Sequence, residues 1–574
     1  MDSIAAAAAA AVDYRGNPAD RSKTGGWLAA GLILVTELSE RMCVIGISMN
    51  LVTYLVGDLH LSTSYSANVV TNFMGTLNLL ALAGGFAADA KLGRFLTAAI
   101  SASVAAAGAS LLTMATSLSS MQPPPCEEFR RGETKCVAAS GGQLAMLFAA
   151  LYIIAAGAGG IKANISGFGS DQFDENDPKE EKAMVFFFNR FYFGISLGSL
   201  FAVTVLIYIQ DNVGRGWGYG ISAAALAGAV MVLLAGTPRY RFRRPQGSPL
   251  TVVARVMWRA WRNRGLPHPP QDSQLNGYEA ATVPRTRRLR FLDKAAIVWR
   301  DENSVSVEPE TRENRATSTL TEVEEVKMVL KLLPVWATSI LFWTIYSQMT
   351  TFSVEQATYM NRKVGAATFP SGSMSVFLFL SILLVTSLNQ RVLVPLARRL
   401  TRNNQGFTSL QRIGVGLIFS VAAMAVAAAV EKSRRDLANN NGTIISVFWL
   451  VPQFCLVGIG EGFAYVGQLE FFIREAPERM KSMSTGLFIS TISMGFFFSS
   501  VLVTVVDRAT NGGWIKDNLD RGRLDYFYWM LVVLGVLNYI VFLGVGRKHQ
   551  YKVHVFQWKN QDEGSDHSKN VELI

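Results

Sequence analysis

The chain has 574 residues, of which 50% are hydrophobic and 17% are charged, and its mean hydropathy is +0.24. These values argue against a series of soluble domains and indicate a polytopic membrane protein. The five histidines and four cysteines show no metal-ligand spacing, so neither a metal ion nor another cofactor is expected.

Long apolar segments recur along the chain, and each has the length of about 20 residues that a helix needs to cross a membrane. They lie at 27–56, 67–90, 95–117, 142–166, 186–209, 217–236, 330–351, 372–396, 411–430, 445–472, 483–506 and 526–546. A soluble helical protein is the alternative, but buried helices rarely run so long without a charge. The predicted fold class is therefore an all-α membrane protein with twelve transmembrane helices.

The spans divide the chain into two groups of six. The expected domains are a tail at 1–26, a six-helix bundle at 27–236, a polar linker at 237–329, a second six-helix bundle at 330–546 and a tail at 547–574. Two bundles joined by a linker are the layout expected when parallel halves rock about a central site.

Charge placement predicts the orientation of these spans. Between Thr237 and Arg300 there are fourteen Arg and Lys residues against three Asp and Glu residues, an excess of +11 that equals the net charge of the whole chain. A loop this basic is expected in the cytosol, which places both tails there as well. We therefore predict a multi-pass membrane protein with both tails in the cytosol. Its expected location is the plasma membrane. In a protein with twelve membrane spans, a basic loop indicates the cytosolic face of the membrane rather than a nucleic-acid site. The loop segment VARVMWRAWRNRG is predicted to be a helix that either lies on the membrane surface or is solvated.

The first span contains TELSERM, in which Glu37, Glu40 and Arg41 stand at i, i+3 and i+4 and so project from one face of a helix. Each charge at the centre of a membrane helix costs about 2.5–3.5 kcal/mol on insertion scales, which argues against a lipid-facing position. The three are expected to pair with one another beside a water-filled cavity. Two carboxylates around one guanidinium can bind and release a proton, so we predict a proton switch; a static buried ion pair is the alternative.

Two loops between spans carry further candidates. In GGFAADAKLGRF, after the second span, Asp89 and Arg94 can bridge neighbouring helix ends at the cytosolic side, unless the segment is a simple turn. Cys126 and Cys136 lie between the third and fourth spans, which this topology places outside the cell, where a disulfide can persist. The sequence leaves the state of that cysteine pair open.

Two further ionisable residues interrupt apolar spans. Lys162 follows a glycine-rich stretch near the end of the fourth span, where close helix approach could bring it to Glu37 and Glu40. The alternative is a lysine that extends to the cytosolic interface. Glu461 follows VGIG in the tenth span, where glycines are expected to loosen the helix beside a transport site. A glutamate at the membrane interface is the alternative.

The seventh span, LFWTIYSQMTTFSVEQ, is rich in aromatic and polar side chains. Trp343, Tyr346 and Thr350 could line the second half of a cavity and bind an anion through hydroxyl and amide donors of this span. Ordinary helix packing is the alternative for such an aromatic stripe.

Three motifs now point to a family. TELSER at 36–41 matches an ExxER motif, GGIKANISGFGSDQFD at 159–174 resembles GGIKPxVxxFGxDQF, and FFNRFYFGISLGSL at 187–200 resembles FYxxINxGSL. In this order they resemble the plant nitrate/peptide transporter family, proton-coupled oligopeptide transporters of the major facilitator fold. The similarity runs from about 26 to 550 and is strongest to the branch of a dual-affinity nitrate transporter.

The resemblance implies roles for the residues above. It implies proton coupling by Glu37, Glu40 and Arg41 with Lys162 as their partner, and substrate binding by Glu461. The Asp89 and Arg94 loop then steadies one conformational state. Thr97 resembles a threonine whose phosphorylation by a kinase tunes affinity; an unmodified helix-cap threonine is the alternative. Tyr346 stands where the nitrate-binding histidine is expected, and a neutral phenol cannot supply that cation.

The predicted function is therefore a proton-coupled symporter that imports nitrate by alternating access and serves nitrate assimilation. Its expected partners are nitrate or another small anion, protons, the lipid bilayer and a kinase acting on Thr97. The alternatives are a carrier of chloride, peptides or a hormone, or a membrane nutrient receptor. An enzyme is not expected, because the chain shows no nucleophile and base constellation and no phosphate-binding glycine loop.

Overall fold

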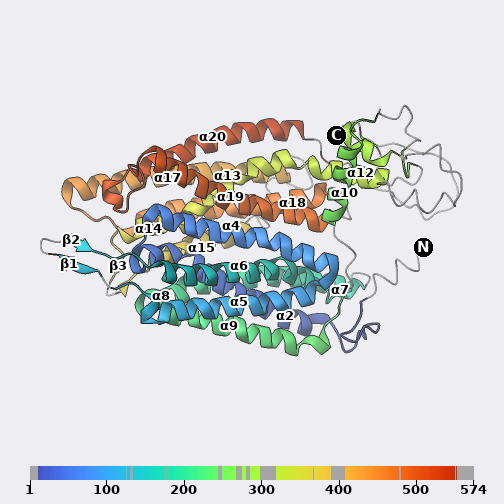
Figure 1. Cartoon of the computed structure of the whole chain (residues 1–574), viewed down its shortest axis with the longest axis horizontal. Helices are drawn as coiled ribbons and strands as arrows, with labels where there is room; N and C mark the ends of the chain where they lie inside the picture. Colours follow the sequence, from blue (N-terminus) through green and yellow to red (C-terminus); the bar gives the residue numbers. More distant parts are fainter. Residues whose placement is uncertain are drawn as a thin grey trace.

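The computed structural model describes residues 11–124, 126–129, 133–174, 177–243, 249–266, 275–278, 285–286, 288–297, 318–365, 367–388, 407–477, 480–549 and 551. Long helices lie side by side in one bundle, with a small β-hairpin projecting from one end and the helices α10 and α12 at the other (Figure 1). We call these the hairpin end and the linker end.

The first half of the chain supplies one group of long helices. Their bounds are α2 Gly26–Ser48, α3 Leu51–Thr53, α4 Thr63–Ala87, α5 Arg94–Ser117, α6 Gly141–Ser170, α7 Pro178–Phe201, α8 Ile207–Asn212 and α9 Arg215–Ala235. Three π-helical turns extend them, η1 Tyr54–Asp58, η2 Ala88–Leu92 and η4 Ala202–Leu206, and two 3-10 turns follow α5 and α9, η3 Ser119–Met121 and η5 Thr237–Arg239.

The second half supplies the other group. Its helices are α13 Leu333–Thr350, α14 Phe352–Thr358, α15 Ser375–Leu388, α17 Ser409–Asn441, α18 Val451–Glu475, α19 Lys481–Ala509 and α20 Leu524–Lys548. Short 3-10 turns join them, η8 Gly372–Met374, η10 Val447–Leu450 and η12 Leu519–Arg521. The linker between the groups holds α10 Pro249–Arg262, η7 Arg290–Ala296 and α12 Leu320–Leu330.

The strands are few and short. β1 Glu127–Phe129 pairs antiparallel with β2 Glu133–Lys135, with Glu128 opposite Thr134, and β3 Lys363–Val364 pairs with β4 Ala367–Thr368. Cys126 and Cys136 flank the first hairpin and are joined by a disulfide. The described chain is otherwise helical, which confirms the predicted all-α fold class.

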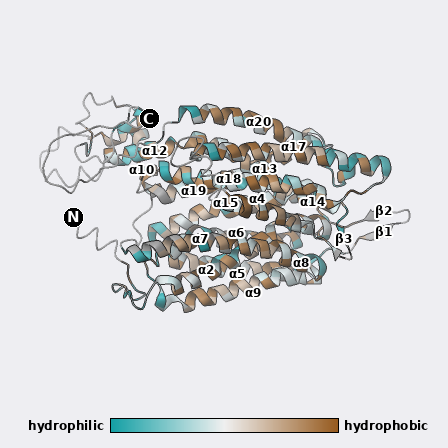
Figure 2. Ribbon diagram, turned by 180° about the vertical axis from the view of Figure 1, so that it is seen from behind, coloured by the Kyte–Doolittle hydropathy of each residue, from teal (hydrophilic) through white to brown (hydrophobic). Residues whose placement is uncertain are grey.

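Each predicted span has a helix at its position. Ten described helices are long and apolar enough to cross a membrane, and Gly372–Leu388 is a shorter apolar helix whose predicted continuation to 396 lies outside the described residues. The first span, α2, carries three charged side chains and is not among the ten. Hydrophobic residues dominate the middle of the bundle and hydrophilic ones its two ends (Figure 2).

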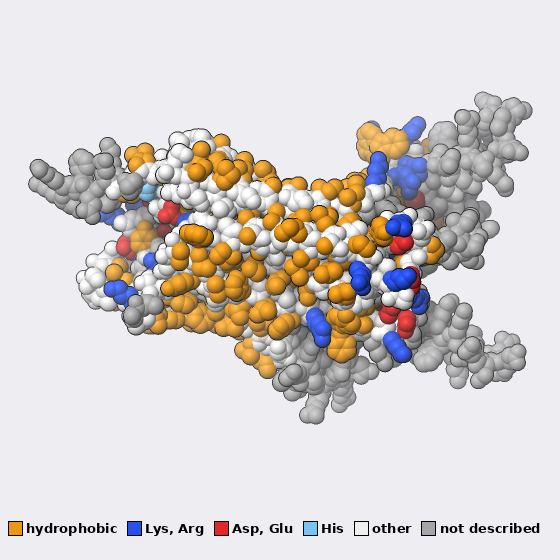
Figure 3. Space-filling view, turned by 90° about the horizontal axis from the view of Figure 1, so that it is seen from below, with side chains coloured by type: hydrophobic (Ala, Val, Ile, Leu, Met, Phe, Trp, Pro, Cys, Tyr) orange, Lys and Arg blue, Asp and Glu red, His pale blue; other side chains and the backbone are white. Residues whose placement is uncertain are grey.

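The outer surface of the bundle is apolar. One face shows hydrophobic side chains over its middle and Lys, Arg, Asp and Glu side chains toward its two ends, most of them at the linker end (Figure 3). On α20, exposed aliphatic side chains follow one another along the helix: Val533, Val536, Leu537, Ile540 and Val541. Such a surface is stable in lipid and costly in water, which fits a membrane-spanning bundle.

Glycines allow α6 to pack closely against its neighbours, as the sequence predicted. A Cβ built on Gly159 would lie 2.8 Å from the carbonyl oxygen of Leu77 on α4, and one built on Gly84 would lie 2.6 Å from the Cα of Gly160. Only hydrogen fits at these positions.

The linker forms a small core of its own at the linker end. Val256 of α10, Leu292 of η7 and Val323 of α12 are buried together. The opposite face of α10 exposes Trp258 and Trp261. The linker helix is thus packed on one side and exposed on the other.

Candidate functional site

The first span brings its three charges together as predicted. In α2, Arg41 Nε lies 3.0 Å from Glu37 Oε1 and 3.0 Å from Glu40 Oε2. Glu37 is 2% exposed and Glu40 is 1% exposed. The contact with Glu37 is a hydrogen bond, whereas both carboxylate oxygens of Glu40 lack a hydrogen-bond donor. Because an ionised carboxylate without donors is costly to bury, Glu40 is the member best placed to accept a proton.

Lys162 of α6 faces the same cluster. Its Nζ donates a hydrogen bond to Asn78 Oδ1 of α4 over 2.6 Å. It also interacts electrostatically with Glu37 and Glu40, and with Glu461 from the other half of the chain. These partners place the ammonium group inside the bundle rather than at the membrane interface.

Glu461 contributes the carboxylate of the second half, from α18. Its Oε2 is buried and has no hydrogen-bond partner, and Lys162 is its electrostatic partner. The expected loosening of this span is wrong, because α18 runs without interruption from Val451 to Glu475. Its glycines allow close packing instead: a Cβ on Gly460 would lie 3.1 Å from the carbonyl oxygen of Gly416 on α17.

Aromatic side chains of the second half form a cluster around Trp343. The ring of Trp343 makes edge contacts with Tyr346 and Tyr465, at centroid distances of 5.6 and 6.2 Å. Trp343 Nε1 donates to Gln468 Oε1 over 3.1 Å, which fixes the indole. Tyr346 interacts electrostatically with Arg41 of the first half and with Glu461 of the second half.

Thr350 occupies a different position from the one expected of a ligand. It is fully buried, and its Oγ1 donates to the carbonyl oxygen of Ser347 over 2.8 Å. The hydroxyl group of Thr350 thus bonds within its own helix. The seventh span breaks at the next residue, Thr351, where φ is −123° and ψ is −98°, and this break separates α13 from α14. The sequence predicted a loosened helix in the tenth span, whereas the structure shows the break in the seventh span.

The residues near the linker end form a separate group. Arg94 Nη1 lies 2.8 Å from Asp171 Oδ2 and also donates to the carbonyl oxygen of Gly167, so it joins the start of α5 to the end of α6. Asp89 lies in η2, at the end of the preceding span. Thr97 is 5% exposed and donates from Oγ1 to the Gly93 carbonyl oxygen over 2.9 Å, so it is not the cap of its helix.

The cysteine pair lies close to a histidine at the hairpin end. His60 Nε2 is 3.2 Å from Cys126 Sγ, and the ligand atoms of His60, Cys126 and Cys136 lie within 4.8 Å of one another. Metal binding needs thiolates, and the disulfide withdraws both of them. The group therefore does not fit a metal ion.

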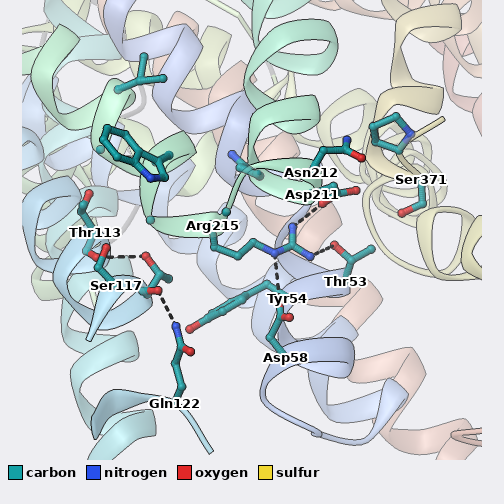
Figure 4. Close-up of a pocket in the computed structure, with 18 of the residues that line it drawn as sticks. Thr53, Tyr54, Asp58, Thr113, Ser117, Gln122, Asp211, Asn212, Arg215 and Ser371 are labelled. Carbon is teal, nitrogen blue, oxygen red and sulfur yellow. Dashed lines mark hydrogen bonds and ion pairs between the residues drawn. The ribbon is translucent and has the colours of Figure 1, made fainter. Parts of the chain in front are cut away.

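A cavity of about 1260 Å³ opens at the hairpin end and is lined by both halves of the chain. Arg215 of α9 points into it, where its Nε lies 2.9 Å from Asp58 Oδ2 and its Nη1 lies 2.7 Å from Asp211 Oδ1 (Figure 4). Thr358 and Arg362 of the second half also line it. Sequence reasoning did not identify this cavity, because its lining comes from span ends far apart in the chain.

Other neighbours of the charge cluster were also missed. Asn78, Tyr465 and Gln468 each contact a predicted site residue. A polar amide within the apolar run NFMGTLNLLALAGG was a signal for Asn78. Nothing in the sequence pairs Gln468 with Trp343, which lies 125 positions away.

Ion-paired charges buried between two groups of membrane-length helices define a multi-pass membrane transporter rather than an enzyme. Comparison with known proteins specifies the family. The model of the POT family, PTR2, matches residues 95–518. The Arabidopsis thaliana protein named Protein NRT1/ PTR FAMILY 6.4 is 65% identical over 555 residues, which cover 97% of this chain and 94% of that protein. Protein NRT1/ PTR FAMILY 6.3 of the same plant is 49% identical, covering 94% of each chain. The chain belongs to the POT family and, among plant proteins, to the NRT1/PTR family.

Solved structures share the fold. The crystal structure of an auto inhibited POT family peptide transporter superimposes with a TM-score of 0.67 at 21% identity, covering 92% of this chain and 98% of that one. A POT family transporter in complex with 5-aminolevulinic acid gives a TM-score of 0.62 at 14% identity, covering 90% and 96%.

Proposed function

We propose that this chain imports nitrate together with protons by alternating access, with the charge cluster around Arg41 as the shared site. The charge balance of the cluster supports this proposal. Glu37, Glu40 and Glu461 supply three carboxylates against the two cations of Arg41 and Lys162. With every group ionised the cluster carries one net negative charge and repels an anion.

Protonation changes the net charge of the cluster from negative to neutral or positive. One proton makes the cluster neutral, and a second makes it positive, so proton binding favours anion binding and the reverse holds by linkage. The donor-free oxygens of Glu40 and the free Oε2 of Glu461 are the acceptors that the geometry favours. An inside-negative potential opposes entry of a monovalent anion by about 2.3 kcal/mol per 100 mV, and the first proton cancels this cost.

The two halves are in contact at the hairpin end, which we take as the outer side of a plasma-membrane protein with both tails in the cytosol. Thr63 N donates to Asp517 Oδ1 over 2.9 Å, and Asn68 Nδ2 donates to Thr504 Oγ1 over 3.0 Å. Ser375 Oγ also lies 3.3 Å from Met49 Sδ. In the proposed cycle these contacts belong to the outer gate around the cavity, and the anion and protons leave inward when the linker ends of the two halves separate. Thr97 at the opposite end is the proposed site at which a kinase tunes affinity.

Anion choice is assigned to Tyr346, which interacts electrostatically with Glu461 and Arg41. A phenol donates a hydrogen bond without charge, so it suits nitrate, chloride or another small anion only after the cluster has bound protons. The test is uptake into oocytes at acidic and neutral external pH, comparing nitrate, chloride and a dipeptide, with wild type beside Tyr346→His and Tyr346→Phe. Nitrate uptake that rises with acidity supports the proposal. Equal nitrate uptake at both pH values, or none, contradicts it.

Proton coupling itself is tested at Glu37 and Glu40. We expect Glu40→Ala and Glu37→Ala to reach the membrane but to lose the pH-dependent part of uptake by about tenfold or more, the equivalent of about 1.4 kcal/mol. Full uptake with an unchanged pH profile would remove the proton role. Reconstituted vesicles separate transport from a receptor function, because a receptor binds substrate without turnover.

The free Oε2 of Glu461 favours one second candidate. A buried carboxylate oxygen without a donor can accept a hydrogen bond from an ammonium group, as in a peptide or another amine-bearing substrate. Dipeptide uptake by wild type that fails in Glu461→Gln, with no nitrate uptake by wild type, would favour this candidate over nitrate.

A further inference from the structure

A histidine beside the disulfide of the first hairpin has no role in the transport mechanism above. His60 lies between η1 and α4, and its Nε2 is 3.2 Å from Cys126 Sγ. Its other ring nitrogen, Nδ1, is 3.0 Å from the backbone carbonyl oxygen of Val137, the residue after Cys136. One imidazole ring therefore contacts both ends of the disulfide-closed hairpin.

The contact with Val137 decides which ring nitrogen of His60 gains or loses a proton. A carbonyl oxygen only accepts hydrogen bonds, so Nδ1 carries the hydrogen atom of this bond. Nε2 is then the nitrogen that is bare in the neutral ring and protonated in the imidazolium ion. Because Nε2 faces Cys126 Sγ, the ring exchanges its proton directly at that sulfur.

The two sulfur atoms of the disulfide differ in their access to water. Cys136 is exposed, whereas Cys126 and His60 are half-buried. A thiol dissolved at the hairpin end therefore meets Cys136 first. Attack on Cys136 Sγ makes Cys126 the leaving group, and a leaving sulfur departs faster when its thiolate is stabilised. The imidazolium form of His60 supplies that stabilisation through Nε2.

We propose that the disulfide between Cys126 and Cys136 is an exchange site for a small water-soluble thiol, which becomes linked to Cys136 while Cys126 leaves toward His60. The attacking thiol loses its proton to water, and its sulfur forms a bond to Cys136 Sγ. The bond between Cys136 Sγ and Cys126 Sγ breaks, and its electron pair stays on Cys126 as a thiolate beside protonated Nε2.

This step replaces one disulfide by another, so it needs no oxidant and no reductant other than the thiol itself. It reverses when the Cys126 thiolate attacks Cys136 Sγ in the mixed disulfide and releases the small thiol. His60 is a positioning residue here, because it acts through the sulfur of Cys126. The proposal goes beyond the proposed transport, and neither the substrate nor the orientation in the membrane enters it.

The exchange site adjoins the large cavity at the hairpin end. Asp58, two residues before His60, and Gln122, four residues before Cys126, both line this cavity. The contact between His60 and Cys126 therefore links two segments of the cavity wall. After exchange this link persists as a thiolate and imidazolium pair, whereas the hairpin of β1 and β2 is no longer closed by a covalent bond.

The first test is peptide mass spectrometry of the purified full-length protein after incubation with reduced glutathione, followed by blocking of free thiols with iodoacetamide. We expect glutathione on Cys136 and the acetamide group on Cys126. Peptide mapping separates these products from the free thiols of Cys43 and Cys455. Glutathione on Cys126 with the acetamide group on Cys136 would overturn the proposal, and so would a disulfide that does not exchange.

The role of His60 is tested by His60→Asn. Asparagine tolerates the left-handed backbone of this position, where φ is +54°, and its amide can donate to Val137, but it does not ionise. Mixed-disulfide formation should slow by about threefold or more, since the leaving sulfur loses its stabilising cation. His549→Asn is the matched control and should keep the wild-type rate, because His549 Nε2 contacts Glu475 instead. A wild-type rate in His60→Asn contradicts the proposal.

The second test uses proteins that lack the disulfide. Cys136→Ser leaves Cys126 as a single thiol, whose proton Nε2 of His60 can accept. Its alkylation by iodoacetamide at neutral pH should be about threefold or more faster than in the double variant Cys136→Ser and His60→Asn. A purely structural role of the disulfide cannot produce this difference, and equal rates would refute the proposal. Neither readout involves nitrate, so failure of the exchange site is distinguished from failure of the proposed function.

Discussion

Lys162 donates its hydrogen bond to the amide oxygen of Asn78, 2.6 Å away, although three carboxylates share its electrostatic surroundings. A neutral partner holds the ammonium group without competing for the protons that Glu37 and Glu40 exchange. The amide is thus a partner of Lys162 that takes no part in proton exchange.

Removal of this amide should change the pH dependence of transport. In Asn78→Ala the ammonium group of Lys162 turns to the carboxylates and stabilises their ionised forms. We expect half-maximal uptake to need a medium more acidic by roughly half a pH unit to one unit. Asn164→Ala is the matched control, since that buried amide donates its hydrogen bonds to the Gly84 and Gly160 carbonyl oxygens rather than to the charge cluster. An unchanged pH midpoint in Asn78→Ala would show that the amide has no such role.

The buried position of Thr97 predicts a structural effect of its modification. Thr97→Asp places a carboxylate where the native side chain is 5% exposed, so we expect a loss of about 1–3 kcal/mol in stability and a changed substrate concentration for half-maximal uptake. Thr97→Ala loses only a bond to the Gly93 carbonyl oxygen and should remain near wild type. Thermal unfolding in detergent measures the first effect and uptake kinetics the second. Equal stability of the two variants would contradict the prediction.

The pair Glu180 and Arg241 predicts a pH-dependent contribution to stability outside the membrane. The hydrogen bond from the Arg241 guanidinium holds the pKa of Glu180 below its usual value of 4.5. A carboxyl group with a lowered pKa in the folded state stabilises the fold above its unfolded pKa, and this contribution is lost as the pH falls through the folded pKa. Glu180→Gln should therefore cost about 1 kcal/mol at neutral pH and nothing in strong acid.

Thermal unfolding of wild type and Glu180→Gln across this pH range gives the comparison. Asp436→Asn serves as a control. The Asp436 side chain is 47% exposed, so its ion pair with Arg435 should contribute little to the free energy of unfolding. A Glu180→Gln deficit that is the same at neutral and acidic pH would refute the electrostatic explanation.

Close packing of α4 against α6 predicts a large effect from one methyl group. Gly84→Ala forces a Cβ to within 2.6 Å of the Gly160 Cα, so the helices must separate, at a cost of about 1–3 kcal/mol. Gly228→Ala adds the same atom where no other atom lies within 4 Å and should be neutral or slightly stabilising. The measurement is the unfolding temperature of the two purified variants, which should be lower for Gly84→Ala than for Gly228→Ala. Equal values would mean that α4 and α6 can move apart at little cost in free energy.

The sequence by itself determined the class of fold and the members of the charge cluster. Segment length and hydropathy specify membrane helices, because each helix forms its backbone hydrogen bonds within itself and must match the bilayer. The spacing of Glu37, Glu40 and Arg41 placed them on one helical face for the same local reason. Only the tertiary structure decided that Lys162 bonds to Asn78, that α18 is continuous while the seventh span breaks at Thr351, and that span ends from both halves line one cavity. Each of these depends on contacts between helices distant in the chain, which the pattern of any single span does not encode.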